Sequence, residues 1–210
     1  MGTESIEASF LSIFALISFF IFLLVSKYSH KIKSGALLDD NYSKPQAFHD
    51  TPVTRSGGIA AIISLNIFFY IYHLLYEDVL YDYIFISCSV FTIGFLDDLK
   101  INIKPSNRLA IMTFLLFAFI YILPIEIFNI DIPFLTSLMS SHMFSSIFVL
   151  LCFLFVINGA NLIDGFNGLL TINLIIINII LAYININNGY LEFSILIIAQ
   201  IIILLSFLLF

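Results

Sequence analysis

The stretch ASFLSIFALISFFIFLLV, Ala8–Val25, contains no charged residue. A helix needs about 20 predominantly apolar residues to cross the hydrocarbon core of a bilayer. The stretch lacks the basic segment in front and the A-x-A-like cleavage site behind that are typical of a secretory signal peptide. It therefore predicts a retained membrane-spanning helix.

The composition indicates that the rest of the chain also lies in a membrane. Of its 210 residues, 61% are hydrophobic and only 10% are charged, which is too apolar for a soluble domain of this size. Cys88 and Cys152 fall inside apolar runs without the spacing of a metal site, so both are predicted to be packing residues. We expect an all-α, polytopic transmembrane helix bundle that forms one domain over residues 1–210. Its seven candidate spans are Ala8–Val25, Gly57–Tyr76, Val79–Leu96, Leu109–Phe128, Met143–Ile157, Leu169–Ile186 and Phe193–Phe210.

The basic residues predict the orientation of these spans. All the basic residues lie after the first or the third span, and they are Lys27, Lys31, Lys33, Lys44, Arg55, Lys100, Lys104 and Arg108. The remaining connections contain no Lys or Arg. Loops rich in Lys and Arg stay in the cytoplasm. The N-terminus is therefore predicted to lie outside. Three polar segments, Lys44–Ala60, Gly94–Ala110 and Asn158–Leu170, then share the cytoplasmic face.

Two adjacent carboxylates end the third predicted span. Asp97 and Asp98 repel each other unless a cation lies beside them, and Mg²⁺ prefers carboxylate and phosphate oxygens. Ionisable groups at membrane depth usually have a function. The alternative is that the pair only ends a helix beside Lys100. The pattern favours a metal site.

A polar repeat follows the fifth predicted span. Asn158, Asn161, Asp164 and Asn167 recur at every third position, and because each step shifts the position around a helix by only about 60°, the first three would share one face. Such amides suit a nucleotide, and Asp164 suits a metal or an oriented phosphate. The same residues, with the intervening glycines, are also typical of an interfacial turn between two helices. Spacing alone leaves both interpretations open.

The first cytoplasmic segment combines Lys44, His49 and Arg55 with Pro52 and the pair Gly57–Gly58. Its positive charge suits a phosphate. Topology alone also places basic residues in such a loop.

Together, HDTPVTRSGG, GFLDDL followed by RLA, and NLIDGFNGL resemble the motifs of the polyprenyl-phosphate N-acetylhexosamine-1-phosphate transferases of glycosyltransferase family 4. The resemblance implies transfer of a sugar-1-phosphate from a UDP-sugar to undecaprenyl phosphate, with release of UMP, as the priming step of cell-envelope polysaccharide synthesis. It implies Mg²⁺ or Mn²⁺ as cofactor, and a location in the bacterial inner membrane with the active-site loops in the cytoplasm. The expected partners are the two substrates and the lipid bilayer, with no nucleic acid, and a homodimer is a candidate assembly.

The resemblance also implies residue roles. Asp97, Asp98 and Asp164 match the catalytic carboxylates, and Asp98 and Asp164 are the expected metal ligands. The expected substrate-binding residues are Asn158, Asn161, Lys44, His49, Arg55, Lys104 and Arg108.

Two features depart from the family pattern. Asn167 stands where the family often has a second Asp, and the later cytoplasmic loops have no counterpart before Phe210. We therefore expect the chain to be the N-terminal portion of a longer transferase with about 10 or 11 spans. The rival hypothesis is an inactive truncated remnant or a non-catalytic scaffold. CDP-alcohol phosphatidyltransferases, DDxxD prenyl-transferring enzymes and transporters fit less well, because the chain lacks their further motifs or their midplane charges.

Overall fold

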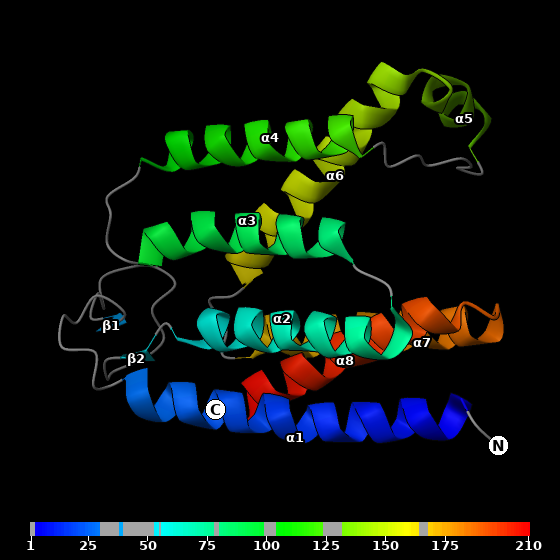
Figure 1. The fold of residues 1–210 in the computed structure, drawn as a ribbon. Coiled ribbons are helices and arrows are strands. Elements are labelled where there is room, and N and C mark those ends of the chain that lie inside the picture. Colours follow the sequence, from blue (N-terminus) through cyan, green and yellow to red (C-terminus); the bar gives the residue numbers. More distant parts are fainter. Residues whose placement is uncertain are drawn as a thin grey trace.

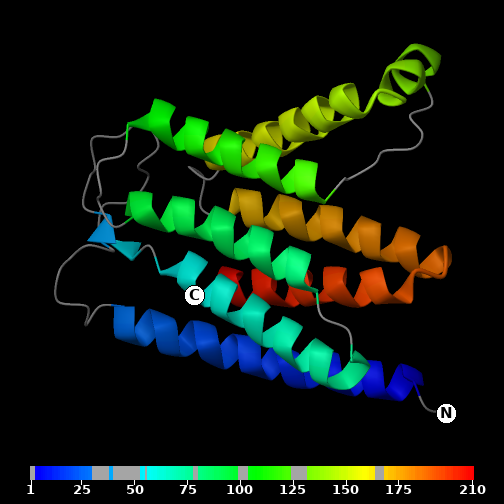
Figure 2. The same cartoon turned by 45° about the horizontal axis from the view of Figure 1, so that its top comes forward.

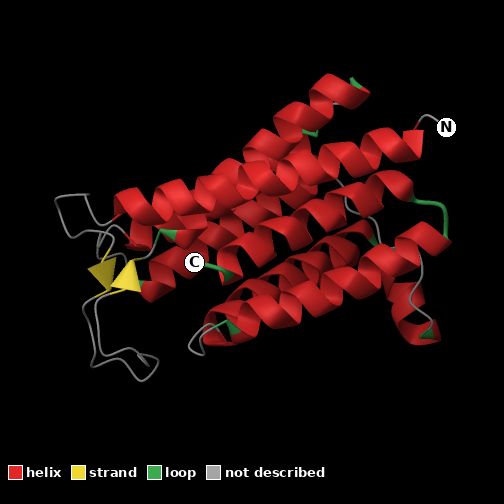
Figure 3. Cartoon of the chain, turned by 90° about the horizontal axis from the view of Figure 1, so that it is seen from below, coloured by secondary structure: helices red, strands yellow, loops and turns green. Residues whose placement is uncertain are grey.

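The computed structural model describes residues 3–29, 38–39, 53–54, 56–77, 80–98, 104–123, 132–163 and 168–210. These residues form a helix bundle, together with two short antiparallel strands, β1 (Leu38–Asp39) and β2 (Val53–Thr54). The helices are α1 (Thr3–Ser29), α2 (Gly57–Tyr76), α3 (Tyr81–Asp98), α4 (Pro105–Ile122), α5 (Pro133–Met139), α6 (His142–Ile163), α7 (Leu169–Asn187) and α8 (Leu191–Leu208). Figure 3 shows how far helices dominate the molecule. The predicted polytopic helix bundle is confirmed.

Seven of these helices correspond to the seven predicted spans. In the part of the chain that the structure describes, five are long and apolar enough to cross a membrane: α1, α2, α6, α7 and α8. The apolar stretches of α3 and α4, Tyr81–Leu96 and Ser106–Ile122, are shorter. The short helix α5 was not predicted. It lies in the connection between α4 and α6, where Pro133 occupies an early helical position that suits its fixed φ.

The seven long helices alternate in direction along the bundle (Figures 1 and 2). As a result, the C-terminal ends of α1, α3, α6 and α8 lie at the same end as the N-terminal ends of α2, α4 and α7. We call this the motif end, because all three polar segments adjoin it. Alternation of the spans was the basis for predicting that these segments meet.

The helices pack around two separate apolar clusters. The first joins α1, α2 and α8, and the second joins α3, α4 and α6. In the first, Phe68 is fully buried, and its ring lies 5.5 Å from that of Phe10 and 5.1 Å from that of Phe14. Small residues such as Ala60 and Ala199 let the helices approach closely, which is how spans associate in the absence of a solvent-driven hydrophobic effect.

Several polar side chains within the spans have hydrogen-bond partners, whereas among the described residues the buried hydroxyls of Ser64 and Tyr76 in α2 have none. Ser18 of α1 donates a hydrogen bond to Ser206 of α8 at 3.1 Å, and both residues are buried. Asn66 donates to the carbonyl of Ile62, and Thr113 donates to that of Leu109. Bonds to the preceding helical turn let polar residues remain in an apolar helix. Large apolar side chains cover much of the outer surface, as expected where lipid replaces water.

Candidate functional site

The motif end receives residues from helices that are distant in sequence. The C-terminal end of α3 brings the backbone of Asp97 and Asp98 to this end, and the last turn of α6 brings that of Asn161. The side chains of these three residues lie outside what the structure describes. Lys44, His49, Arg55 and Asp164 lie outside the described residues altogether. Their predicted roles remain predictions.

The start of α4 carries two basic residues. Lys104 is exposed and precedes the helix, and its carbonyl oxygen accepts hydrogen bonds from the backbone N–H groups of Asn107, at 2.9 Å, and Arg108, at 3.1 Å. Pro105 occupies the first turn, where its missing N–H is not needed. A helix N-terminus already carries a partial positive charge. Lys104 and Arg108 add two positively charged side chains at this point of the bundle.

Arg108 and Asn158 line one cavity, although fifty positions separate them in the sequence. The cavity has a volume of about 270 Å³, and its other lining residues are Ser106, Leu109 and Met112. It lies between α4 and α6, which pack against each other. The structure thus brings together two of the predicted substrate-binding residues and supplies a space beside them.

Asn158 is held in a defined orientation. Its side-chain nitrogen donates a hydrogen bond to the carbonyl oxygen of Leu154, at 2.7 Å, and the residue is exposed. With the amide nitrogen engaged on the helix, the amide oxygen is the acceptor that the side chain presents. Half-buried Arg108 supplies a guanidinium with donors in a rigid planar fork, which matches phosphate geometry. The pair therefore offers an acceptor together with a cationic donor.

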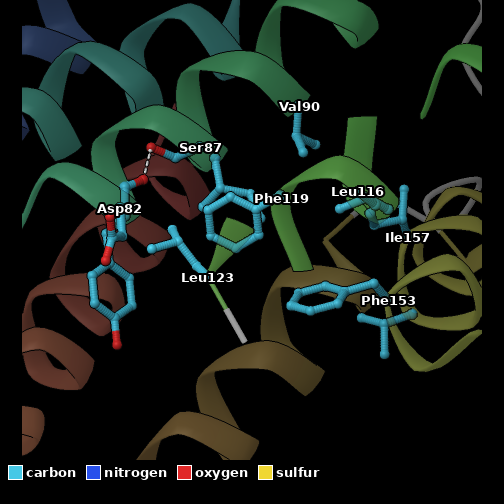
Figure 4. Close-up of a pocket in the computed structure, with 11 residues that line it drawn as sticks. Asp82, Ser87, Val90, Leu116, Phe119, Leu123, Phe153 and Ile157 are labelled. Atoms are coloured by element: carbon cyan, nitrogen blue, oxygen red, sulfur yellow. Dashed lines mark hydrogen bonds between the residues drawn. The ribbon is translucent and has the colours of Figure 1, made fainter. Parts of the chain in front are cut away.

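A larger apolar cavity lies between α3, α4 and α6 (Figure 4). Its volume is about 800 Å³, and Phe119, Leu123 and Phe153 gather around it. Asp82 lies at one side, and Ser87 donates to the carbonyl oxygen of Tyr83, at 2.6 Å, rather than to the cavity. The remaining lining residues are Ile86, Val90, Leu116, Val156 and Ile157. The lining is therefore almost wholly apolar.

The two cavities follow one another along the same pair of helices. Met112 lines the smaller cavity, and Leu116, one turn further along α4, lines the larger. On α6, Asn158 lines the smaller cavity, and the preceding Ile157 lines the larger. Both steps lead away from the motif end. A cavity with basic and polar lining residues thus lies beside an apolar one that extends toward the opposite end of the bundle, where Asp82 and Leu123 line it.

Sequence reasoning missed the larger cavity. Its lining residues on α3 follow helical spacing, and so do those on α4 and α6. In helices that are apolar on every side, this spacing does not mark one face as different from another. The only signal visible in the sequence was Asp82, a charged residue within the third predicted span.

Divalent metal binding was expected at Asp98 and Asp164. Among the described residues, no group of three His, Cys, Asp or Glu side chains could hold a metal ion. The donors implied by the sequence are the adjacent carboxylates at the end of α3 and the carboxylate that follows α6 by one position. The ends of α3 and α6 both belong to the motif end. Hard carboxylate oxygens of this kind fit Mg²⁺ or Mn²⁺.

Comparison with models of protein families gives a match. The model of a family described as glycosyl transferase family 4 matches residues 80–210, which is more than half of the chain. The match covers α3 to α8, whereas Lys44, His49 and Arg55 precede it. No curated protein and no solved structure matches the chain significantly. Members of the family are membrane-bound glycosyl-phosphate transferases that use lipid-phosphate and sugar-nucleotide substrates and generally a divalent metal. The chain belongs to glycosyl transferase family 4.

Proposed function

We propose that this protein transfers N-acetylhexosamine-1-phosphate from a UDP-sugar to undecaprenyl phosphate, releasing UMP. The reaction would take place at the cytoplasmic face of the bacterial plasma membrane, as the priming step of cell-envelope polysaccharide synthesis. Such a phosphoryl transfer depends on positioning and on neutralisation of charge more than on covalent help from the protein. A site at the edge of a membrane bundle suits one water-soluble and one lipid substrate.

The main support for this proposal is that two cavities with different linings follow one another along α4 and α6. Arg108 and Asn158 line the polar cavity near the motif end, and the apolar cavity follows at Leu116 and Ile157. Undecaprenyl phosphate likewise has a polar part and an apolar part, because its phosphate lies at one end of a long hydrocarbon chain. Arg108 would pair with a phosphate by charge-assisted hydrogen bonds, and the apolar cavity would take the first part of the chain.

The carboxylates supply the proposed chemistry. Asp97 removes the proton from the lipid phosphate, and the resulting oxygen attacks the β-phosphorus of the UDP-sugar. A new phosphorus–oxygen bond forms there, and the bond from the β-phosphorus to the oxygen bridging it to the α-phosphate breaks, so that UMP leaves. Asp98 and Asp164 would hold the divalent metal, which supplies charge neutralisation for the diphosphate when bound.

The remaining predicted residues would hold the donor and its phosphates. Asn158 and Asn161 lie on the last turns of α6 and would serve the nucleotide side. Lys104 would add positive charge at the start of α4. Lys44, His49 and Arg55 are proposed for the first polar segment on their match to the family motif.

The proposal is tested by following UMP release in membranes that contain the protein, with UDP-N-acetylglucosamine, undecaprenyl phosphate and Mg²⁺. Arg108→Gln removes the charge beside the polar cavity, and it should lower the rate about 100-fold, as for loss of one preorganised donor to a reacting phosphoryl group. Lys27→Gln is the matched control, because Lys27 is an exposed base in the last turn of α1. It should transfer at the wild-type rate.

Absence of lipid-linked product from the wild-type protein with every UDP-N-acetylhexosamine would overturn the proposal and favour the non-catalytic scaffold. Equal transfer rates for Arg108→Gln and the wild type would show that the polar cavity is not part of the active site. Loss of activity in Lys27→Gln as well would show that general positive charge, not Arg108, governs the rate.

A further inference from the structure

The C-terminal turn of α8 lies against the first residues of two other helices at the motif end. A Cβ atom placed on Gly57, the first residue of α2, would overlap Cε2 of Phe207 and lie 2.8 Å from its Cδ2. A Cβ atom on Gly168, directly before α7, would lie 3.0 Å from Cδ1 of Leu208. A Cβ atom on Gly57 would therefore displace the Phe207 ring, whereas one on Gly168 would require the end of the Leu208 side chain to move by a few tenths of an ångström.

The end of α8 is itself supported from a third helix. The Phe207 ring packs edge to face with that of Phe22 in α1, with 6.3 Å between centroids, and the rings of Phe210 and Phe19 lie 5.3 Å apart. Phe22, Phe207 and Phe210 line a cavity of about 410 Å³ whose polar lining residues are Ser26 and Ser56. One helical turn thus joins the motif ends of α1, α2, α7 and α8.

The two glycines are junctions in the chain. Gly57 follows Arg55 by two positions, and Gly168 follows Asp164 by four. The backbone at each glycine therefore fixes where a polar segment meets its helix. Gly168 also has a φ of 73°, which suits glycine and fixes the direction in which α7 begins.

We propose that Phe207 and Leu208 are positioning residues for the transfer reaction, acting through Gly57 and Gly168 respectively. The inference rests on the proposed function, since it concerns the placement of the groups that would carry it out. Neither residue needs to touch substrate. Each contacts the glycine that adjoins a predicted functional segment in the sequence, and a displacement of about 1 Å at reacting groups can lower a rate about 100-fold.

The test is a double-mutant cycle on Phe207→Ala and Gly57→Ala, with kcat, KM for both substrates and the midpoint of thermal unfolding measured on the purified, membrane-reconstituted protein. Phe207→Ala removes the contact, and Gly57→Ala displaces the ring. Each should lower kcat about tenfold with a smaller change in KM and an unfolding midpoint close to that of the wild type. The double variant should lose no more than either single variant, because both changes disrupt the same contact.

Leu209→Ala is the matched control. Leu209 follows Leu208 directly, but its side chain is 69% exposed, compared with 39% for Phe207 and 44% for Leu208, and it does not line the cavity. Truncation there should leave both kcat and KM unchanged. Leu208→Ala, in contrast, should lower kcat as Phe207→Ala does.

The outcomes separate this inference from the proposed function. No transfer by the wild type overturns the proposed function and this inference with it. Wild-type transfer with additive losses in the double variant, or with losses that follow the unfolding midpoint, overturns the positioning role alone. Wild-type transfer with coupled losses in kcat supports both.

Discussion

Asp97 is the residue on which the proposed chemistry depends most. Replacing it with Asn keeps the size of the side chain and removes its ability to accept the lipid phosphate proton. We expect Asp97→Asn to lower the transfer rate by about 100-fold or more, as for removal of a general base. The measurement is UMP release at saturating concentrations of both substrates, normalised to the amount of inserted protein.

The control for this variant is Glu192→Gln, which neutralises an exposed carboxylate in the first turn of α8 and should leave the rate unchanged. Near-normal turnover by Asp97→Asn would exclude Asp97 from the mechanism. It would then direct attention to Asp98 or to a base supplied from another part of the site.

For single residues, the sequence could identify Asp97 and Asn158 as candidates from their types and local spacing, and Arg108 from its resemblance to the basic residue that follows the Asp-Asp motif of the family. It could not show that Arg108 and Asn158 share a cavity. That fact depends on the packing of α4 against α6, and no periodicity within either segment encodes it. Positive-inside alternation predicted only that both residues belong to the same end of the bundle.

For the individual helices, the predicted ends of the spans differ from the observed helix ends where polar residues continue a helix. α2 begins and ends as predicted, at Gly57 and Tyr76. α6 instead runs through Asn158 to Ile163, because the Asn158 side chain bonds to its own helix rather than ending it. α4 starts at Pro105, four positions before the apolar run, and stops at Ile122. Leu123 precedes Pro124, and a residue before proline disfavours helical geometry.

The packing of α3, α4 and α6 makes a second prediction, because the apolar cavity that these helices enclose is proposed to take the lipid chain. Val156→Trp should fill part of this cavity, since Val156 lines it while remaining 66% exposed. We expect KM for undecaprenyl phosphate to rise about tenfold, in line with the loss of a few buried methylene groups. KM for the UDP-sugar should not change, and steady-state kinetics with each substrate varied in turn measures both.

Phe155→Trp is the control for this effect. Phe155 is the preceding residue on α6, is 75% exposed and does not line the cavity. Equal changes in both KM values for Val156→Trp would mean that the substitution distorts the site as a whole. An unchanged KM for the lipid would place the hydrocarbon chain elsewhere on the bundle.

For the whole molecule, the orientation in the membrane is the prediction that connects the fold to the reaction. Every Lys and Arg lies after the first or the third predicted span, so the positive-inside rule places the motif end in the cytoplasm. This is the compartment in which a nucleotide sugar is available to the site. The short helix α5 lies away from the motif end (Figure 1) and should face outward.

Cysteine labelling measures this orientation. After Cys88 and Cys152 have been replaced with Ala, Ser106→Cys places a thiol in the first turn of α4, and Ser137→Cys places one in α5; both serines are exposed. A membrane-impermeant maleimide should label Ser137→Cys in intact cells and Ser106→Cys only after the membrane has been opened. The reverse pattern would put Arg108 and Asn158 outside. A UDP-sugar in the cytoplasm could then not reach the polar cavity. The proposed reaction would be impossible for that reason, even if the side chains at the site were suited to it.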